Sequence, residues 1–283
     1  MDETSVRRLK ISVIGMQRSG NHAVIQWLQS LFQSARHIND ANHDFWLTDG
    51  NQHSLADQTL FVSFEDSRKK LLNGALLSDS VALPKRENSE HRTIVVLRDP
   101  YNLWASRVTA KRARGLSCPD GVDFFLNQYL DLVMLSQTDS VLPIKYNHWI
   151  SSRSYRTTIC NQLGGTYSES TLQTTPRHGG GSSFDGISRA PLLYRLARRP
   201  RALLSTENWR KLFSNPLKVS RDLFVGKQVR PDTKRLLNRW STIDMCEDSR
   251  TVFGSSALAS ISREQFGFYL SMDDQGQVHK VCF

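Results

Sequence analysis

Residues 11–32, ISVIGMQRSGNHAVIQWLQSLF, combine the pattern of a buried strand with that of an amphipathic helix. The run Ile11–Ile14 is short and apolar, whereas AVIQWLQSLF at the end carries apolar residues at near-helical spacing. The glycine-containing turn between them, Gly15–His22, lets the backbone N–H groups of the starting helix face a ligand. This stretch therefore predicts a strand, an anion-binding turn and a helix.

The turn has the glycine spacing of a Walker A loop, GxxxxG, without that loop's functional side chains. Asn21 and His22 stand where a Walker A loop needs Lys and the Ser or Thr that binds magnesium. Arg18 is the strong cation of the turn. We therefore predict an anionic ligand bound without a metal, and a tight turn with no ligand is the alternative. The candidate binding residues are Gln17, Arg18, Ser19, Gly20, Asn21 and His22.

A second motif follows a later strand. The β-branched run TIVVL at residues 93–97 predicts a central strand, and RDPYNLWASR comes directly after it. Pro100 suits the first turn of a helix. Arg98 would then end the strand and Ser106 would lie two turns into the helix, where a guanidinium and a hydroxyl can donate to a phosphate. Arg98 could instead pair with Asp99 or with a helix terminus.

Together the two motifs resemble those of the sulfotransferases that use 3'-phosphoadenosine 5'-phosphosulfate (PAPS). That family opens with PKSGTTW after a strand, which here is MQRSGNHAV with Arg18 in place of the Lys. Its later Arg-x-Pro strand end, with a Ser further on, is here LRDPYNLWAS. The stretches IKYN at 144–147 and SSF at 182–184 resemble the two adenine-contacting stretches of the family, in the same order. The combination looks more like bacterial sulfotransferase-domain proteins than like the animal cytosolic enzymes.

The resemblance implies a transferase that moves the sulfuryl group of PAPS, its co-substrate, to a hydroxyl or amine by in-line transfer without a metal. Arg18 and the backbone of the turn would stabilise the leaving 5'-phosphate. Arg98 and Ser106 would bind the 3'-phosphate. Tyr146, Ser182 and Phe184 would form the adenine site, and the alternative for the two aromatic rings is an ordinary place in the core.

An acceptor hydroxyl also needs a general base. The cytosolic enzymes have a His at the end of the strand between the two phosphate motifs, and here FVSFE places Glu65 at that point. Carbohydrate sulfotransferases of the same fold use a glutamate, so Glu65 is the first candidate. His43 in the polar region 35–59 is the rival, and Glu65 could instead cap a following helix. The candidate catalytic residues are therefore Glu65, Arg18 and His43.

Length and periodicity predict one α/β domain over residues 1–283, with a central parallel sheet and helices on both faces. The predicted strands lie near residues 10–15, 60–64, 93–97 and 141–145. The predicted helices cover residues 21–34, 101–114, 122–136, 151–163, 191–213 and 231–246, and residues 35–59 are predicted as a loop. Ligands of such sheets bind at the carboxyl ends of the strands. All four motifs are expected at such ends, so they can converge on one ligand.

The net charge of +10 resides in one segment, Arg189–Arg235, because the remaining residues carry equal numbers of basic and acidic side chains. This segment is a lid or insertion, a clamp over the cofactor, a surface for an acidic acceptor, or a contact with anionic membrane. No motif that binds RNA or DNA accompanies the charge, which disfavours nucleic acid as a partner. A kinase or NTPase, and a non-enzymatic basic module, are the alternative functions.

One departure from the family pattern lies near the C-terminal end of the sequence. The C-terminal RKGxxGDWK segment of the cytosolic enzymes is missing, and Arg239–Trp240 or the arginines within 195–199 are candidates to replace it. The four cysteines are far apart and, with no apolar signal or membrane span in the sequence, they predict reduced thiols in a cytoplasmic protein. The polar regions outside the motifs favour a small polar metabolite or a saccharide as the acceptor.

Overall fold

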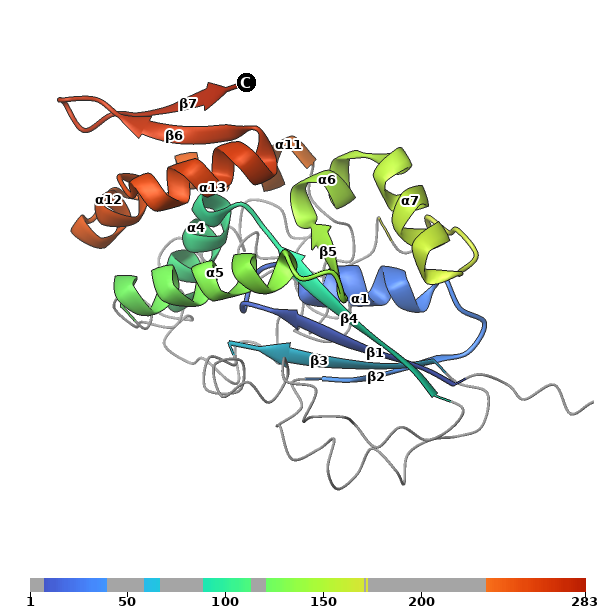
Figure 1. Ribbon diagram of the computed structural model, residues 1–283. Helices are drawn as coiled ribbons and strands as arrows, with labels where there is room; N and C mark the ends of the chain where they lie inside the picture. The colour runs from blue at the N-terminus through green and yellow to red at the C-terminus, as the bar shows by residue number, and fades with distance from the viewer. Residues whose placement is uncertain (1–7, 40–58, 67–88, 113–120, 171, 173–232) are drawn as a thin grey trace, which may run out of the picture. The chain divides into compact units, whose positions relative to one another are not determined.

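The computed structural model describes residues 8–39, 59–66, 89–112, 121–170, 172 and 233–283 (Figure 1). The chain divides into two compact units, of which the first comprises Met1–Glu169 with Thr233–Phe283 and the second comprises Ser170–Asp232. The structural description below concerns the first unit. It is an α/β unit built on one parallel sheet, as the sequence predicts.

The sheet has five strands in the order β2-β3-β1-β4-β5, and every pair is parallel. The strands are β1 (Arg8–Gly15), β2 (Ala35–Ile38), β3 (Thr59–Glu65), β4 (Ser89–Leu97) and β5 (Val141–Lys145). In the register, Gly15 lies opposite Glu65 of β3 and Val96 of β4. The strand ends that carry the sequence motifs therefore share one edge of the sheet.

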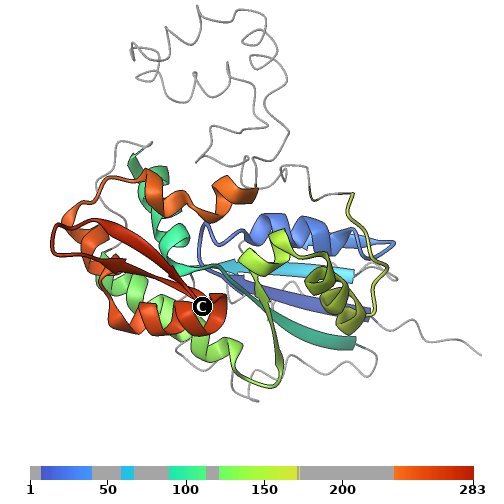
Figure 2. The ribbon, with the colours of Figure 1, turned by 90° about the horizontal axis from the view of Figure 1, so that it is seen from above.

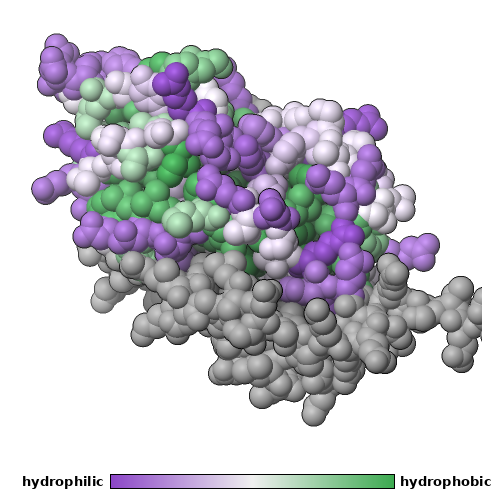
Figure 3. Space-filling model, in the orientation of Figure 1, coloured by the Kyte–Doolittle hydropathy of each residue, from purple (hydrophilic) through white to green (hydrophobic). Residues whose placement is uncertain are grey.

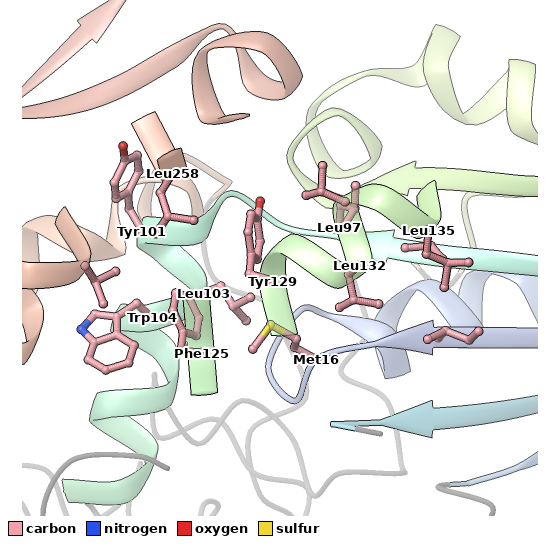
Figure 4. Packing of buried hydrophobic residues seen from close by; sticks show 14 of the residues in the cluster. Met16, Leu97, Tyr101, Leu103, Trp104, Phe125, Tyr129, Leu132, Leu135 and Leu258 are labelled. Atoms are coloured by element: carbon pink, nitrogen blue, oxygen red, sulfur yellow. The ribbon is translucent and has the colours of Figure 1, made fainter. Parts of the chain in front are cut away.

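Helices cover both faces of the sheet. On β1, residues 11–14 are all at most 2% exposed, so side chains pointing to either face are buried. One face packs against α4 (Pro100–Arg112) and α5 (Val122–Ser136) in the main hydrophobic cluster. On the other face, Phe61 of β3 contacts Phe32, which follows α1 (Asn21–Gln29), with ring centroids 5.9 Å apart. Figure 4 shows Met16, which directly follows β1, near Tyr129 of α5 in the main hydrophobic cluster.

The C-terminal elements gather beside α4, at the end of the sheet to which the strands point (Figures 1 and 2). They pack there through rings such as Tyr101 of α4 and Phe253, whose centroids are 5.5 Å apart. The remaining elements in chain order are α6 (Tyr146–Ser151), α7 (Arg153–Leu163), α11 (Thr233–Leu237), the 3-10 helix η3 (Arg239–Thr242), α12 (Glu247–Phe253), α13 (Ser256–Phe266) and the antiparallel hairpin of β6 (Phe268–Met272) and β7 (Val278–Cys282).

Three predicted elements need correction. Residues 35–59 are not all loop, because Ala35–Ile38 pairs with β3 as the edge strand β2. The first helix ends at Gln29 rather than at residue 34. The helix predicted over 231–246 is interrupted at Asn238, which lies between α11 and η3. The side-chain Nδ2 of Asn238 donates to the carbonyl of Lys234 at 2.8 Å. The helix predicted over 191–213 lies outside the described residues.

Hydrophobic residues reach the surface of this unit among strongly hydrophilic ones (Figure 3). The large apolar side chains that are exposed among the described residues are Met134 and Phe283, at 68% and 67%. In the same part of the chain, no helix is long and apolar enough to cross a membrane. Cys160, Cys246 and Cys282 are free thiols, and Cys118 lies outside the described residues.

Candidate functional site

The turn between β1 and α1 has an unusual backbone that opens the start of the helix at the sheet edge. Arg18 has a φ of 75°, in the left-handed region, and Gly20 has a φ of 99°. Ser19 N donates to the carbonyl of Met16 at 3.1 Å, and Met16 itself is fully buried in the core. The carbonyl of Gly20 then accepts the first hydrogen bonds of α1. The turn is thus anchored at Met16 and leads directly into a helix N-terminus, the arrangement that favours anions.

Tyr146, which the sequence places at an adenine site, packs against this turn. A Cβ atom on Gly20 would lie 2.3 Å from Cε2 of Tyr146, so the ring rests directly on the glycine. Tyr146 is 5% exposed. The centroid of its ring lies 5.1 Å from Cζ of Arg98 and 5.5 Å from the ring centroid of Trp149. The structure therefore brings Tyr146, Gly20 and Arg98 together from three strand ends.

Arg98 joins the turn to the C-terminal part of the unit. It is 5% exposed, and its Nη1 donates to the carbonyl of Arg18 at 3.1 Å while its Nη2 donates to the carbonyl of Leu236 at 3.1 Å. Its Nε is buried and has no hydrogen-bond partner among the described residues. A buried donor without a partner is costly, so this atom favours an anionic ligand beside it. Ser106, the other predicted 3'-phosphate residue, is 6% exposed on the following helix.

A buried polar network holds Arg98 in this position. Asp99 is fully buried and caps α4 by accepting from the backbone N of Asn102 at 2.9 Å. It also accepts from the side-chain amide of Asn147 at 2.8 Å, which ties the end of β4 to the start of α6. Asn102 continues the network, because it donates to the carbonyl of Leu237 at 2.7 Å and accepts from Trp240 N at 3.1 Å.

This network places Arg239 and Trp240 against the second motif, RDPYNLWASR. One of the two candidate replacements for the missing RKGxxGDWK segment requires this position. Arg239 is 1% exposed in η3. On the opposite side, the hydroxyl of Tyr129 donates to the carbonyl of Arg98 at 3.0 Å. Burial, and then the charge of Asp99, hold the pKa of Tyr129 well above its usual value, so this hydroxyl keeps its proton.

Glu65 ends β3 beside the turn, and its carboxylate faces the first residues of α1. Its Oε1 accepts from Nδ2 of Asn21 at 3.3 Å and lies 3.6 Å from Nδ1 of His22. Asn21 in turn accepts from the hydroxyl of Ser19 at 2.7 Å. The side chain of Glu65 is 13% exposed, and Nε2 of His22 contacts Oδ1 of Asn39 at 2.6 Å. The candidate base and the predicted binding turn therefore form one connected group.

Two residues that the sequence analysis did not single out belong to the same site. Asp66, with a φ of 48°, accepts from the backbone N of Gln17 at 3.0 Å. Nη1 of Arg107 donates to both oxygens of Asp66, at 2.8 and 3.1 Å, and to the carbonyl of Gln17 at 3.3 Å. The predicted role of Gln17 needs revision, since its N–H is held by Asp66 instead of facing a ligand. In the sequence, Asp66 follows a strand end and Arg107 follows Ser106, but neither position by itself shows that the two side chains meet at the turn.

The remaining predicted positions lie outside the described residues: His43, Ser182, Phe184 and the arginines within 195–199. Among the described residues, no group of three or more His, Cys, Asp or Glu side chains could hold a metal ion. The site that can be described is therefore a helix start of the kind that favours anions, flanked by two buried arginines, Arg98 and Arg107, and by two carboxylates, Glu65 and Asp66.

The sequence matches no family model, and a comparison with curated proteins finds no match. Solved structures similar to this chain include mouse sulfotransferase SULT7A1 complexed with PAP, at 13% identity and a TM-score of 0.39, with 58% of this chain and 61% of that chain covered. The match thus spans about three fifths of SULT7A1.

Two further similar structures are a sulfotransferase domain and a retinol dehydratase. The sulfotransferase domain of the Synechococcus PCC 7002 olefin synthase has 13% identity and a TM-score of 0.42, covering 89% of this chain and 95% of that chain. Retinol dehydratase in complex with androsterone and inactive cofactor PAP has 12% identity and a TM-score of 0.41, covering 90% and 81%. At this level of similarity, the assignment of function depends on the geometry of the site itself.

Proposed function

We propose that this protein is a sulfotransferase that transfers the sulfuryl group of PAPS to a hydroxyl or amine. The observation that carries the proposal is Arg98, a nine-tenths buried arginine that links the anion-binding turn to Leu236 and keeps a buried Nε–H without a partner among the described residues. Of the four motifs that resemble the PAPS-dependent family, the three that the structure describes converge at one sheet edge, which supports the proposal.

The residues present fit the two anionic ends of PAPS. The N-terminus of α1 and the side chain of Arg18 would bind the 5'-phosphosulfate, while Arg98 and Ser106 would bind the 3'-phosphate. When bound, PAPS supplies the sulfuryl group and an adenosine bisphosphate leaving group. Donors fixed before the reaction lower the barrier, because charge grows on the leaving phosphate. Tyr146 would lie beside the adenine, with Ser182 and Phe184 as its predicted partners.

For the general base we propose Glu65, since its carboxylate is held at the sheet edge beside the turn and is partly exposed. Glu65→Gln preserves the shape of the side chain and removes its basicity, so turnover should fall about 10²- to 10⁴-fold. Binding of adenosine 3',5'-bisphosphate should change little, because the base acts on the acceptor. If Glu65→Gln keeps near-full turnover while His43→Ala abolishes it, His43 is the base.

The acceptor that we propose is a small polar metabolite or a saccharide. We also propose that residues 189–235 form a basic lid or insertion of a single domain, next to the acceptor or to an anionic membrane. The reaction would take place in the cytoplasm, where thiols such as those of Cys160 and Cys246 stay reduced. A screen of acceptors with labelled PAPS tests this, and turnover of flat apolar phenols alone would contradict the acceptor class.

Isothermal titration calorimetry tests the central proposal. The full chain is titrated with adenosine 3',5'-bisphosphate and, separately, with ATP, each with magnesium and with EDTA. We expect micromolar binding of the bisphosphate that does not need magnesium. Tight, magnesium-dependent binding of ATP with no binding of the bisphosphate would instead identify a kinase or NTPase.

A further inference from the structure

We infer that Arg107 and Asp66 form a positioning pair that holds the turn in the conformation that binds the 5'-phosphate end of the nucleotide. This inference rests on the proposed function, because it assigns the pair to one end of the same ligand. Arg107 lies on α4 and Asp66 follows β3, so the pair connects two elements to the turn between β1 and α1.

The contacts of the pair converge on one residue of the turn. Asp66 accepts from the backbone N of Gln17, and Arg107 donates to the carbonyl of the same residue, at 3.0 and 3.3 Å. The side chain of Arg107 is 5% exposed and that of Asp66 is 16% exposed, so solvent screens their 2.8 Å contact only weakly. Both backbone polar groups of Gln17 are therefore fixed by side chains from outside the turn.

The conformation of Arg18 explains why the turn needs such support. A non-glycine residue at a φ of 75° is strained, and strain of this kind persists only where the surroundings fix it. The two carbonyls that flank this residue are each held by an arginine, Gln17 O by Arg107 and Arg18 O by Arg98. Because each peptide is planar and trans, its N–H points away from its carbonyl. The N–H of Arg18 is therefore turned away from Arg107.

Charge gives the pair a second effect. A carboxylate beside an anion-binding turn would repel a phosphate, and Arg107 compensates the charge of Asp66 at contact distance. The pair thus fixes the backbone while adding no net charge. All three contacts of Arg107 come from its Nη1, and the Nζ of a lysine lies one bond nearer the backbone than this atom. A lysine at position 107 would therefore keep the charge but end short of Asp66 and of the carbonyl of Gln17. Arg107→Lys therefore separates positioning from charge.

The test is Arg107→Lys, titrated with adenosine 3',5'-bisphosphate, adenosine 5'-monophosphate and adenosine 3'-monophosphate. We expect roughly tenfold weaker binding of the two ligands that carry a 5'-phosphate. Binding of adenosine 3'-monophosphate should stay within about twofold, because Arg98 and Ser106 are unchanged. Equal losses for all three ligands, or no loss for any, would overturn the inference, since a purely structural pair would not distinguish the ends of the nucleotide.

Arg92→Lys is the matched control, because Arg92 also pairs with a carboxylate, that of Glu90, but sits on β4 far along the strand from the turn. It should bind all three ligands like the unchanged protein. If Arg107→Lys does not fold, the double variant Arg107→Gln/Asp66→Asn replaces it, because it keeps the pair neutral and asparagine tolerates the left-handed φ of position 66. The same selective loss, smaller because an amide oxygen can still accept from Gln17 N–H, is then expected, and its absence overturns the inference.

These titrations also separate the inference from the proposed function. If the unchanged protein binds none of the three ligands, the proposed function fails and the pair has no such ligand to position. If the unchanged protein binds adenosine 3',5'-bisphosphate and both variants bind it equally well, the proposed function stands and the positioning role of the Arg107–Asp66 pair is wrong.

Discussion

Gly20→Ala should destabilise the protein strongly for two reasons, the left-handed backbone at Gly20 and the close approach of the Tyr146 ring. Alanine at a φ of 99° costs about 1–2 kcal/mol for the left-handed backbone alone. The added Cβ would also lie 2.3 and 2.4 Å from two ring carbons of Tyr146, too close for any real contact. That ring cannot move freely, because it is 5% exposed and packs on Arg98 and Trp149. Relieving such overpacking costs about 1–3 kcal/mol more.

The expected total is therefore about 2–5 kcal/mol lost from the free energy of unfolding. The assay is guanidinium unfolding followed by circular dichroism. Gly164→Ala is the control, because Gly164 has a left-handed φ of 69° and nothing within 4 Å of its added Cβ, so only the backbone cost should appear. Replacing Tyr146 with Leu in the Gly20→Ala background should recover most of the difference. Equal losses for Gly20→Ala and Gly164→Ala would refute the steric argument.

Three further predictions concern the site and the core beside it. Arg98→Ala should weaken binding of adenosine 3',5'-bisphosphate about 10- to 150-fold by calorimetry, and a folded variant with full affinity would contradict the assignment. Asp99→Ala should lower the free energy of unfolding by roughly 2–4 kcal/mol in denaturant titrations, because it removes a helix cap, one of the two acceptors of the Asn102 side-chain amide and the acceptor of the Asn147 amide. Burial raises the pKa of Tyr101 to about 12, whereas in the unfolded chain this hydroxyl loses its proton near pH ~10. The free energy of unfolding should therefore fall by about 2–3 kcal/mol as the pH rises from ~10 to ~12. In thermal melts, Tyr101→Phe should lose less stability than the unchanged protein over this pH range.

The central strands were predictable because their burial leaves a plain signal. β1, β3, β4 and β5 carry apolar or β-branched runs, and runs buried on both faces are typical of parallel sheets. β2 was not predictable, since ARHI is short and polar and lies at the sheet edge. α6 escaped detection because it begins at Tyr146, directly after β5 and without a side-chain cap. Local sequence carries little information about an edge strand or an uncapped helix.

For the site, the sequence predicts what lies at strand ends and misses what tertiary contacts select. Arg98, Glu65 and Tyr146 each follow a predicted strand, so the geometry of parallel sheets brings them together. Asp66 and Arg107 were not singled out, because nothing local shows that a side chain from α4 reaches the turn. The same holds for the N–H of Gln17, whose partner is 49 residues away in the sequence.

The bond from Arg98 to the carbonyl of Leu236 has a consequence for biosynthesis. The two residues are 138 positions apart, so this hydrogen bond cannot form until the ribosome has made the intervening chain. At roughly 5–20 residues per second, this delay lasts about 7–28 s. During translation the sheet edge can form early, but its arginine gains its second anchor only after Leu236 has been made. A nascent chain released before Leu236 should therefore carry the turn without a fully fixed Arg98.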